Sequence, residues 1–177
     1  SDEVRAAVRA GEAPEIQTVT SGRLMKKPVA IALRDRPYAY LLPRDAVDAV
    51  AMLRRHDITV ERLTEPMSLE VQAYTVAGVT YEQAYNHSAA ARVEVGEVRM
   101  VTREFPAGTF MVPTGQMLGR LVTHMLEAET DDNVIYWNTM DAWLPRPGTE
   151  GADDPLVPIF KVMQPVAIPT LMVDEVR

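Results

Sequence analysis

Few residues in this 177-residue chain have types and spacing suited to chemistry. The clearest pattern is His124-Met125-Leu126-Glu127, in which an imidazole and a carboxylate stand three positions apart. On a helix, two residues at this spacing lie on one face and could share a zinc ion. A complete site would need further ligands from distant parts of the chain. The pattern therefore offers His124 and Glu127 as a candidate metal pair, and no more than a pair.

The remaining histidines and the serines form no recognisable catalytic motif. No two of His56, His87 and His124 stand at metal-binding spacing. Ser68 and Ser88 lack the sequence of a nucleophile elbow, so a hydrolase triad built with His87 has little support. A small hydrolase that uses His87 or His124 with nearby carboxylates is the weaker alternative for function.

Two neighbouring carboxylates, Asp131 and Asp132, could serve in general acid–base chemistry or in calcium binding. They follow a predicted helix and precede Asn133, and this composition favours a turn. No glycine-based calcium loop surrounds them, and the chain contains no GxGxxG or phosphate-loop motif. We interpret the pair as part of a turn.

Three aromatic side chains, Tyr136, Trp137 and Trp143, could line a groove that binds a peptide or a glycan. If residues 134–137 form a strand, Tyr136 and Trp137 point to opposite faces and at least one of them is in the core. Trp143 can instead cover an edge of the sheet. A contiguous exposed aromatic patch would favour an independent binding module, and burial of all three would count against it.

A strand, a helix, a turn and a second strand are predicted between residues 105 and 144. The first strand ends at Pro113, and Thr114 is the predicted N-cap of a helix that begins near Gly115 or Gln116. The second strand is Val134–Trp137. The helix carries one apolar stripe, formed by Leu118, Leu121, Val122 and Met125.

The helical phase argues against zinc binding by His124 and Glu127. At about 100° per residue, both fall opposite the apolar stripe and on the same face as Arg120. A solvated polar face explains all three residues, and a cation would oppose a neighbouring metal ion. We therefore predict that Arg120, His124 and Glu127 form a surface or an interface, and we assign no catalytic residue.

The rest of the chain predicts a mixed α+β fold with two main helices. Tyr38–Leu42, a helix over residues 44–56 and Thr59–Leu63 form a strand–helix–strand unit that can carry a parallel crossover. Residues 69–112 alternate in polarity and should be mainly antiparallel. Residues 1–14, with a short helix over 4–9, are a predicted linker or inter-domain connection. Residues 15–177 are a predicted single domain with an irregular loop at 145–158. Further strands are expected at Ile16–Val19, Val29–Leu33, Ile159–Val162 and Val166–Met172, the last as an edge strand.

Composition excludes several classes of function. The net charge of −7 and the isoelectric point near 5.0 give no general affinity for nucleic acid. Without cysteine, the chain can form no disulfide, thiolate zinc site or cysteine nucleophile. No apolar segment approaches the roughly 20 residues that span a bilayer. The start at Ser1, without methionine, is typical of a processed product or of a piece of a longer protein.

A family resemblance rests on the segment VPTGQMLGRLVTHMLEAETDDNVIYWNTMDAWL, residues 112–144. It resembles the region that follows the catalytic domain in large bacterial members of the zinc carboxypeptidase (carboxypeptidase A-like metallopeptidase) family. Upstream, Arg55, His56 and Ile58 resemble the family's strand entry, although Asp57 replaces its usual glycine. The resemblance covers roughly residues 28–165. Its matching positions in residues 112–144 are Val112, Pro113, Thr114, Gln116, Gly119, Arg120, Leu121, Leu126, Glu127, Asp132, Trp137, Asn138 and Asp141.

This resemblance implies a noncatalytic accessory domain of a metallopeptidase-family protein. His124 and Glu127 lie within the carboxy-terminal motif and do not correspond to the family's zinc site. The resemblance thus implies that zinc belongs only to a peptidase domain absent from this chain, and that this domain of the same parent protein is the partner. It also implies a periplasmic or extracellular location. A homo-oligomer is possible, and whether the chain is itself an enzyme is left open.

Overall fold

The computed structural model describes residues 2–11, 29–30, 33–84, 86–148 and 155–173. The chain divides into two compact units, Ser1–Arg34 and Asp35–Arg177. In the first unit, helix α1 (Asp2–Arg9) contains the helix predicted over 4–9. The predicted strand Ile16–Val19 lies outside the described residues. Val29, Ala30 and Leu33, the described residues of the next predicted strand, are not in a strand.

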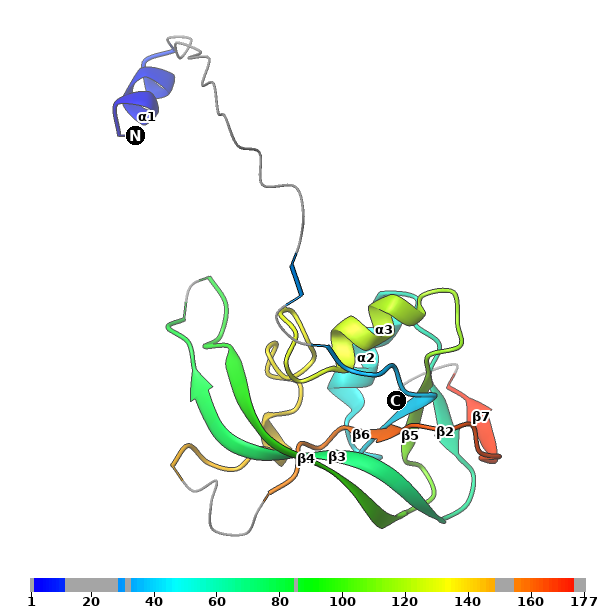
Figure 1. Ribbon diagram of the computed structural model, residues 1–177. Helices are drawn as coiled ribbons and strands as arrows, with labels where there is room; N and C mark the ends of the chain where they lie inside the picture. Colours follow the sequence, from blue (N-terminus) through cyan, green and yellow to red (C-terminus); the bar gives the residue numbers. More distant parts are fainter. Residues whose placement is uncertain (1, 12–28, 31–32, 85, 149–154, 174–177) are drawn as a thin grey trace. The chain divides into compact units, whose positions relative to one another are not determined.

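The second unit is built on a seven-stranded sheet with the order β4-β3-β6-β1-β5-β2-β7 (Figure 1). Every pairing between its described strands is antiparallel, which confirms the mainly antiparallel prediction. The fold is α+β, with strands dominating over helices. The strands are β1 (Ala39–Leu42), β2 (Glu61–Leu63), β3 (Met67–Tyr81), β4 (Ala91–Phe105), β5 (Phe110–Pro113), β6 (Phe160–Val162) and β7 (Thr170–Met172).

The predicted strand–helix–strand unit is present as β1, helix α2 (Val47–Arg55) and β2. Both strands pair antiparallel with β5, so they run parallel to each other with β5 between them. The predicted edge strand is also present, because β7 pairs only with β2 in the sheet order. Within the described residues, no helix is both long and apolar enough to cross a membrane.

Strands β3 and β4 form a long, curved hairpin (Figure 1). Its register shifts between Tyr74 and Val76 and again between Val76 and Gly78, and such bulges increase strand bending. At this irregularity the Thr75 hydroxyl accepts a hydrogen bond from the Glu97 amide at 2.8 Å. A Cβ at Gly96 would lie 2.6 Å from that hydroxyl, so the bend requires glycine there.

Both faces of the central strands are covered by apolar side chains. On the face toward the helices, Tyr40 and Phe110 pack with Leu53 of α2 and with Val122 of helix α3 (Gly119–Leu126). On the other face, a second cluster includes Leu41, Leu69, Val71, Phe160 and Val162. All four residues of β1 are buried, because alternate side chains enter alternate clusters.

Helix α3 begins later than predicted. Its N-cap residue is Leu118, not Thr114, and the Thr114 hydroxyl instead donates to the Pro37 carbonyl at 2.6 Å. Between them, the Gln116 side chain accepts from the Thr59 amide at 2.8 Å and donates to the Thr59 carbonyl at 3.0 Å. These side chains join the segment before α3 to neighbouring chain segments, and the helix starts after them.

The predicted strand Val134–Trp137 is wrong, since these residues form turns. The Asn133 side-chain oxygen accepts hydrogen bonds from the amides of Ile135 and Tyr136, both at 2.9 Å. An asparagine that satisfies amides two and three residues ahead stabilises a turn in place of a ladder. A 3₁₀ helix, η1 (Asp141–Trp143), follows. In the described parts of the predicted loop 145–158, Leu156 forms an isolated bridge with Thr75.

We predict that Gly119→Ala destabilises the domain. A Cβ at this position would lie 2.1 Å from the Thr114 carbonyl oxygen, so backbone must move. Alanine gains up to about 1 kcal/mol of helix propensity, but overpacking of this kind costs about 1–3 kcal/mol. Gly115→Ala is the matched control, because nothing lies within 4 Å of its added Cβ. Urea unfolding that shows equal stability for both variants would contradict the prediction.

Candidate functional site

Glu127 does not lie on the polar face of the helix. Helix α3 ends at Leu126, and Glu127 adopts an extended backbone conformation with φ −79° and ψ 125°. The prediction placed Glu127 on the helix, but the helix ends at the residue before it. The side chain of Glu127 therefore does not follow the spacing of about 100° per residue that relates the helical residues. Arg120 and His124 are exposed as expected, whereas Glu127 is buried. The prediction that these three side chains share one solvated face is wrong for Glu127.

The Glu127 carboxylate is held by three buried side chains. Its Oε1 accepts from the Tyr40 hydroxyl at 2.6 Å and lies 2.7 Å from Lys161 Nζ. Its Oε2 accepts from the Tyr74 hydroxyl at 3.0 Å. Lys161 Nζ also donates to the Tyr74 hydroxyl at 2.9 Å, so the contacts close into a ring. We call Tyr40, Tyr74, Glu127 and Lys161 the buried polar cluster.

Sheet register brings the members of this cluster together. Tyr40 on β1 is directly opposite Lys161 on β6, and Gln72 on β3 is opposite Lys161 on its other side. Tyr74 stands two residues beyond Gln72, hence on the same face of the sheet. Three adjacent strands thus direct side chains toward Glu127, which follows the last residue of α3.

Burial makes this cluster electrostatically demanding. The side chains of Lys161 and Glu127 are only 3% and 10% exposed, and buried charges are costly unless they are paired and hydrogen-bonded. Burial, followed by the Glu127 charge, raises the pKa of Tyr40, which keeps its hydroxyl protonated as a donor. Both carboxylate oxygens are therefore engaged by donors.

The structure does not bring His124 and Glu127 to one metal position. The His124 side chain is exposed, while its carbonyl accepts from the Thr130 hydroxyl, and Glu127 turns inward. Across the part of the chain that the structure describes, no three His, Asp or Glu side chains form a group that could hold a metal ion.

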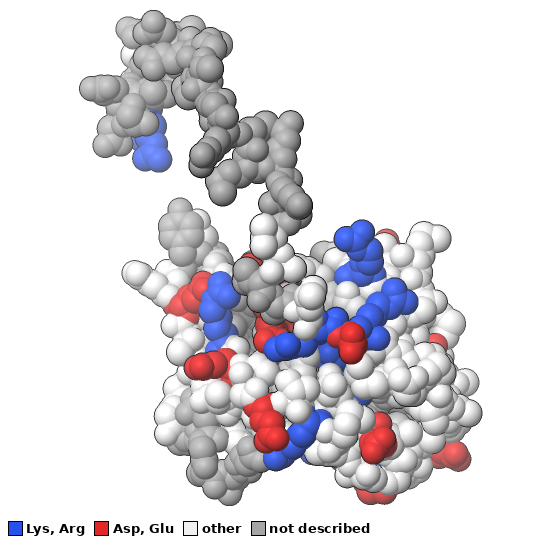
Figure 2. Space-filling model, in the orientation of Figure 1, with Lys and Arg blue, Asp and Glu red and all other residues white. Residues whose placement is uncertain are grey.

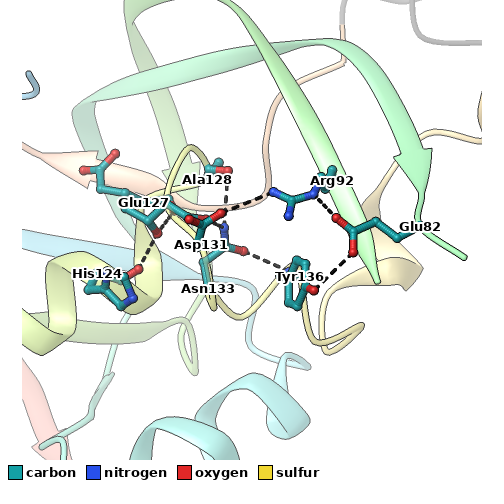
Figure 3. A network of polar contacts seen from close by, with 9 residues as sticks. Glu82, Arg92, His124, Glu127, Ala128, Asp131, Asn133 and Tyr136 are labelled. Atoms are coloured by element: carbon teal, nitrogen blue, oxygen red, sulfur yellow. Dashed lines mark hydrogen bonds and ion pairs between the residues drawn. The ribbon is translucent and has the colours of Figure 1, made fainter. Parts of the chain in front are cut away.

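A second network joins the tip of the β3–β4 hairpin to the turn after α3 (Figure 3). Arg92 Nε donates to Glu82 Oε1, and Arg92 Nη1 lies 3.4 Å from Asp131 Oδ1. The Tyr136 hydroxyl donates to Glu82 Oε2 at 3.2 Å, and the guanidinium lies 5.1 Å from the Tyr136 ring centroid. The hydrogen bond from Arg92 lowers the pKa of Glu82, whereas burial and Glu82 raise the pKa of Tyr136.

The neighbouring Asp131 and Asp132 serve the turn. Asp131 pairs with Arg92, and Asp132 adopts a left-handed conformation with φ 60°. Asn133 completes the turn through its side-chain amide, which donates to the carbonyl of Thr130. The turn predicted at these residues is confirmed, and the two carboxylates have separate structural roles.

The three predicted aromatic residues do not share one groove. The rings of Tyr136 and Trp137 pack edge to face with their centroids 5.3 Å apart. The rings of His87 and Trp137 pack in the same way with a centroid distance of 5.5 Å. Trp137 is 40% exposed. Trp143, on η1, instead lines pockets with Pro43, Arg103 and Phe160.

The histidines and serines considered for a hydrolase have separate structural roles. His87 Nδ1 is 2.6 Å from the Ser88 carbonyl oxygen, a backbone contact and not a contact with a nucleophilic hydroxyl. His56 is the C-cap residue of α2. Ser68 is on β3 opposite Glu104 of β4.

Sequence reasoning missed Tyr40, Tyr74 and Lys161. The available signal was a lysine within the short apolar segment 159–162, which is a predicted strand. A lysine in a strand buried on both faces needs an anionic partner. Nothing in the local pattern, however, indicates which carboxylate that partner is.

Comparison with known proteins finds similarity to proteins named carboxypeptidase 2. Carboxypeptidase 2 of Trichophyton tonsurans and of Trichophyton equinum are each 30% identical to the chain over 106 residues, 59% of the chain and 19% of the relative. Probable carboxypeptidase 2 of Arthroderma benhamiae is 30% identical over 105 residues, 58% of the chain and 20% of the relative. No protein-family model matches, and no solved structure matches significantly.

These matches identify a carboxypeptidase-related region in the chain. The relatives are fungal proteins that are named as carboxypeptidases. The chain spans about a fifth of the length of the curated relatives it matches.

We predict that Glu127→Gln lowers the free energy of unfolding by about 3–5 kcal/mol, because it leaves a buried lysine without its counter-charge. Lys161→Met should also destabilise. The double variant Glu127→Gln/Lys161→Met should lose about 1–3 kcal/mol less than the sum of the two single changes. Denaturant unfolding followed by circular dichroism measures this cycle, with Glu65→Gln in an exposed turn as control. Strict additivity would show that the ion pair contributes no coupling.

We also predict an acid-dependent contribution from Glu82. Its pKa lies below the ordinary value of 4.5 in the folded chain, so its contribution to stability is present above pH 4.5 and is lost as pH falls through the folded pKa. Melting temperatures of the wild-type chain and Glu82→Gln should therefore differ at pH 7 and converge in acid. A gap that stays constant from pH 7 to about pH 3 would refute this assignment.

Proposed function

We propose that this chain is a noncatalytic accessory region of a zinc carboxypeptidase-type protein. In this proposal it follows a peptidase domain of the same parent protein, packs against it, and supports its fold, substrate access or assembly. Zinc would belong to that domain. Two observations support the relationship: the segment 112–144 with its family resemblance, and the matches to fungal carboxypeptidase 2 proteins.

The observation that carries the noncatalytic role is the use of Glu127. Glu127 belongs to the sequence pattern with the clearest resemblance to a metal or acid–base pair. Its carboxylate instead accepts from Tyr40 and Tyr74 and pairs with Lys161 beneath the end of α3. A carboxylate engaged in this way supports the packing of α3 on the sheet and favours a structural role for the motif.

A surface beside α3 suits contact with another domain. Met117, Arg120 and His124 are exposed and are spaced by three and four residues, so they follow one side of the helix and the turn before it. Met117 is fully exposed and adds a flexible apolar side chain to this side of the helix. We call these three residues the α3 surface. Basic side chains are frequent over the α2–α3 region in Figure 2, which favours a partner surface with acidic groups.

The first test uses the chain alone. It should bind zinc at well below one equivalent, as measured by elemental analysis, and should release no C-terminal residue from peptide substrates. Stoichiometric zinc together with turnover by the isolated chain would overturn the noncatalytic assignment.

The second part of the test concerns the α3 surface. If a peptidase domain is encoded upstream in the same reading frame, Met117→Glu and Arg120→Glu should each weaken its association with this chain by at least about tenfold, or 1.4 kcal/mol. A buried carboxylate or a reversed charge opposes docking. Arg146→Glu, the same charge reversal at an exposed residue outside α2 and α3, is the matched control. Unchanged association for both α3 variants, measured by calorimetry, would exclude this surface.

A further inference from the structure

A surface at the tip of the β3–β4 hairpin is not used by the proposed accessory role. The turns that follow α3 lie along this tip at two points. The Asn138 side-chain amide donates to the Ala89 carbonyl at 3.0 Å, and the Trp137 ring packs on the His87 ring with a centroid distance of 5.5 Å. Asn138 and Ala89 are 49 residues apart in the chain, so side chains from two distant segments form one surface here.

Aromatic side chains are exposed on this surface. Tyr81 and Trp137 are 43% and 40% exposed, and His87 is exposed as well. We call Tyr81, His87 and Trp137 the aromatic patch. The Trp137 ring also packs edge to face on Tyr136, so it is held from two sides and keeps a solvent-exposed part. A fixed and accessible aromatic ring suits stacking with a planar or cationic group.

A carboxylate beside the patch has an unfilled hydrogen-bonding position. Asn138 has a left-handed backbone conformation with φ 61°, and its side-chain amide donates to Asp141 Oδ2 at 3.0 Å. The other oxygen, Asp141 Oδ1, is buried and accepts no hydrogen bond from the residues that the structure describes. Such an oxygen is costly, and a donor supplied by a ligand offsets that cost. Asp141 as a whole is partly exposed, so a ligand at the patch can approach its carboxylate.

Asp141 lies close to the aromatic patch on two sides. Burial, followed by the Asp141 charge, raises the pKa of Tyr81. Trp137 precedes Asn138, and Asn138 holds Asp141 through its side chain. The carboxylate therefore has one ring of the patch near it from the hairpin and another from the turn.

The charged groups of the neighbouring network are mainly acidic (Figure 3). The side chains of Glu82 and Asp131 are 38% and 83% exposed, and the guanidinium of Arg92 already pairs with both of them. With Asp141 included, three carboxylates stand against one arginine. The chain as a whole has a net charge of −7. This electrostatic environment attracts a cation and repels a phosphate or an acidic peptide.

An arginine side chain matches both the rings and the charge. Its planar guanidinium stacks on an aromatic ring and donates two parallel N–H groups to a carboxylate. A lysine ammonium pairs with a carboxylate only as a point charge. A neutral sugar stacks on tryptophan but leaves the negative charge of the surface unused. The combination of aromatic rings and acidic groups therefore favours an arginine-containing ligand.

We propose that the aromatic patch binds an arginine side chain of a partner protein. The guanidinium stacks on Trp137 and donates to the carboxylate of Asp141. This site involves none of the residues of the α3 surface, and it holds whether or not the chain is an accessory region of a peptidase.

Tryptophan fluorescence provides a local reporter. The chain has two tryptophans, so Trp143→Phe leaves Trp137 as the sole tryptophan. The probe is a capped peptide with one arginine between glycine and serine residues, and the control peptides carry glutamine or lysine in its place. The arginine peptide should change the Trp137 emission saturably, with an affinity at least about tenfold above that of the glutamine peptide. The lysine peptide should bind with an intermediate affinity, because it keeps the charge but loses the planar fork.

Two substitutions test the contacts themselves. By calorimetry, Asp141→Asn and Trp137→Leu should each weaken the arginine peptide by about tenfold or more. Asparagine keeps an oxygen for the Asn138 amide and removes only the charge. Glu65→Gln is the matched control, because it removes an exposed carboxylate before the opposite end of β3. Circular dichroism and melting of each variant separate loss of binding from loss of fold.

Three outcomes would overturn the proposal. The first is equal affinity for the arginine and glutamine peptides. The second is unchanged binding by folded Asp141→Asn and Trp137→Leu variants. The third is a saturable change in Trp137 emission with a neutral oligosaccharide but not with the arginine peptide, which would assign the aromatic patch to sugar binding.

Discussion

The buried ion pair between Lys161 and Glu127 is the constraint on which the domain's arrangement depends. Two charges at 2.7 Å are removed from water, and their mutual attraction offsets that cost only if the remaining hydrogen-bonding positions are filled. Tyr40 and Tyr74 fill them, and each comes from a different strand. The pair therefore requires correct positions for β1, β3, β6 and the end of α3 together. A shift of one residue in the pairing register of β6 would turn Lys161 to the opposite face of the sheet. That face carries the apolar cluster with Leu41 and Val71, neither of which offers an anionic group to the lysine.

Elements with strong local patterns could be predicted from the sequence. The alternation of residues 69–112 and the apolar face of α2 correctly indicated a largely antiparallel sheet and a helix, because burial of one face sets these periods. The carboxy-terminal edge strand was indicated by Pro165 and Pro169, which cannot donate to a ladder. These features depend on residues near one another in the chain.

The candidate site depended on details that a periodic pattern does not contain. Helix α3 stops one residue before Glu127, and that residue decides whether the carboxylate faces solvent or the core. Thr114 has the type of an N-cap but is used by Pro37, a partner far away in sequence. Asn133 overrides the strand propensity of Val134–Trp137 through two bonds to the backbone. Two of these outcomes depend on which hydrogen-bonding partner a side chain takes: Thr114 bonds to a distant carbonyl, and Asn133 bonds to nearby amides. The third depends on the residue at which a helix ends.

The position of β1 in the sheet has a consequence for how the chain folds. Its neighbours are β5 and β6, so the apolar strand Ala39–Leu42 pairs only with segments that follow much later in the sequence. Pairing over such separations is slow, because loop-closure entropy is lost before the contacts form. During synthesis, β1 therefore emerges well before either partner and presents apolar side chains and free backbone groups meanwhile. This interval, more than the finished sheet, is the stage at which the domain is most exposed to aggregation and to the action of chaperones.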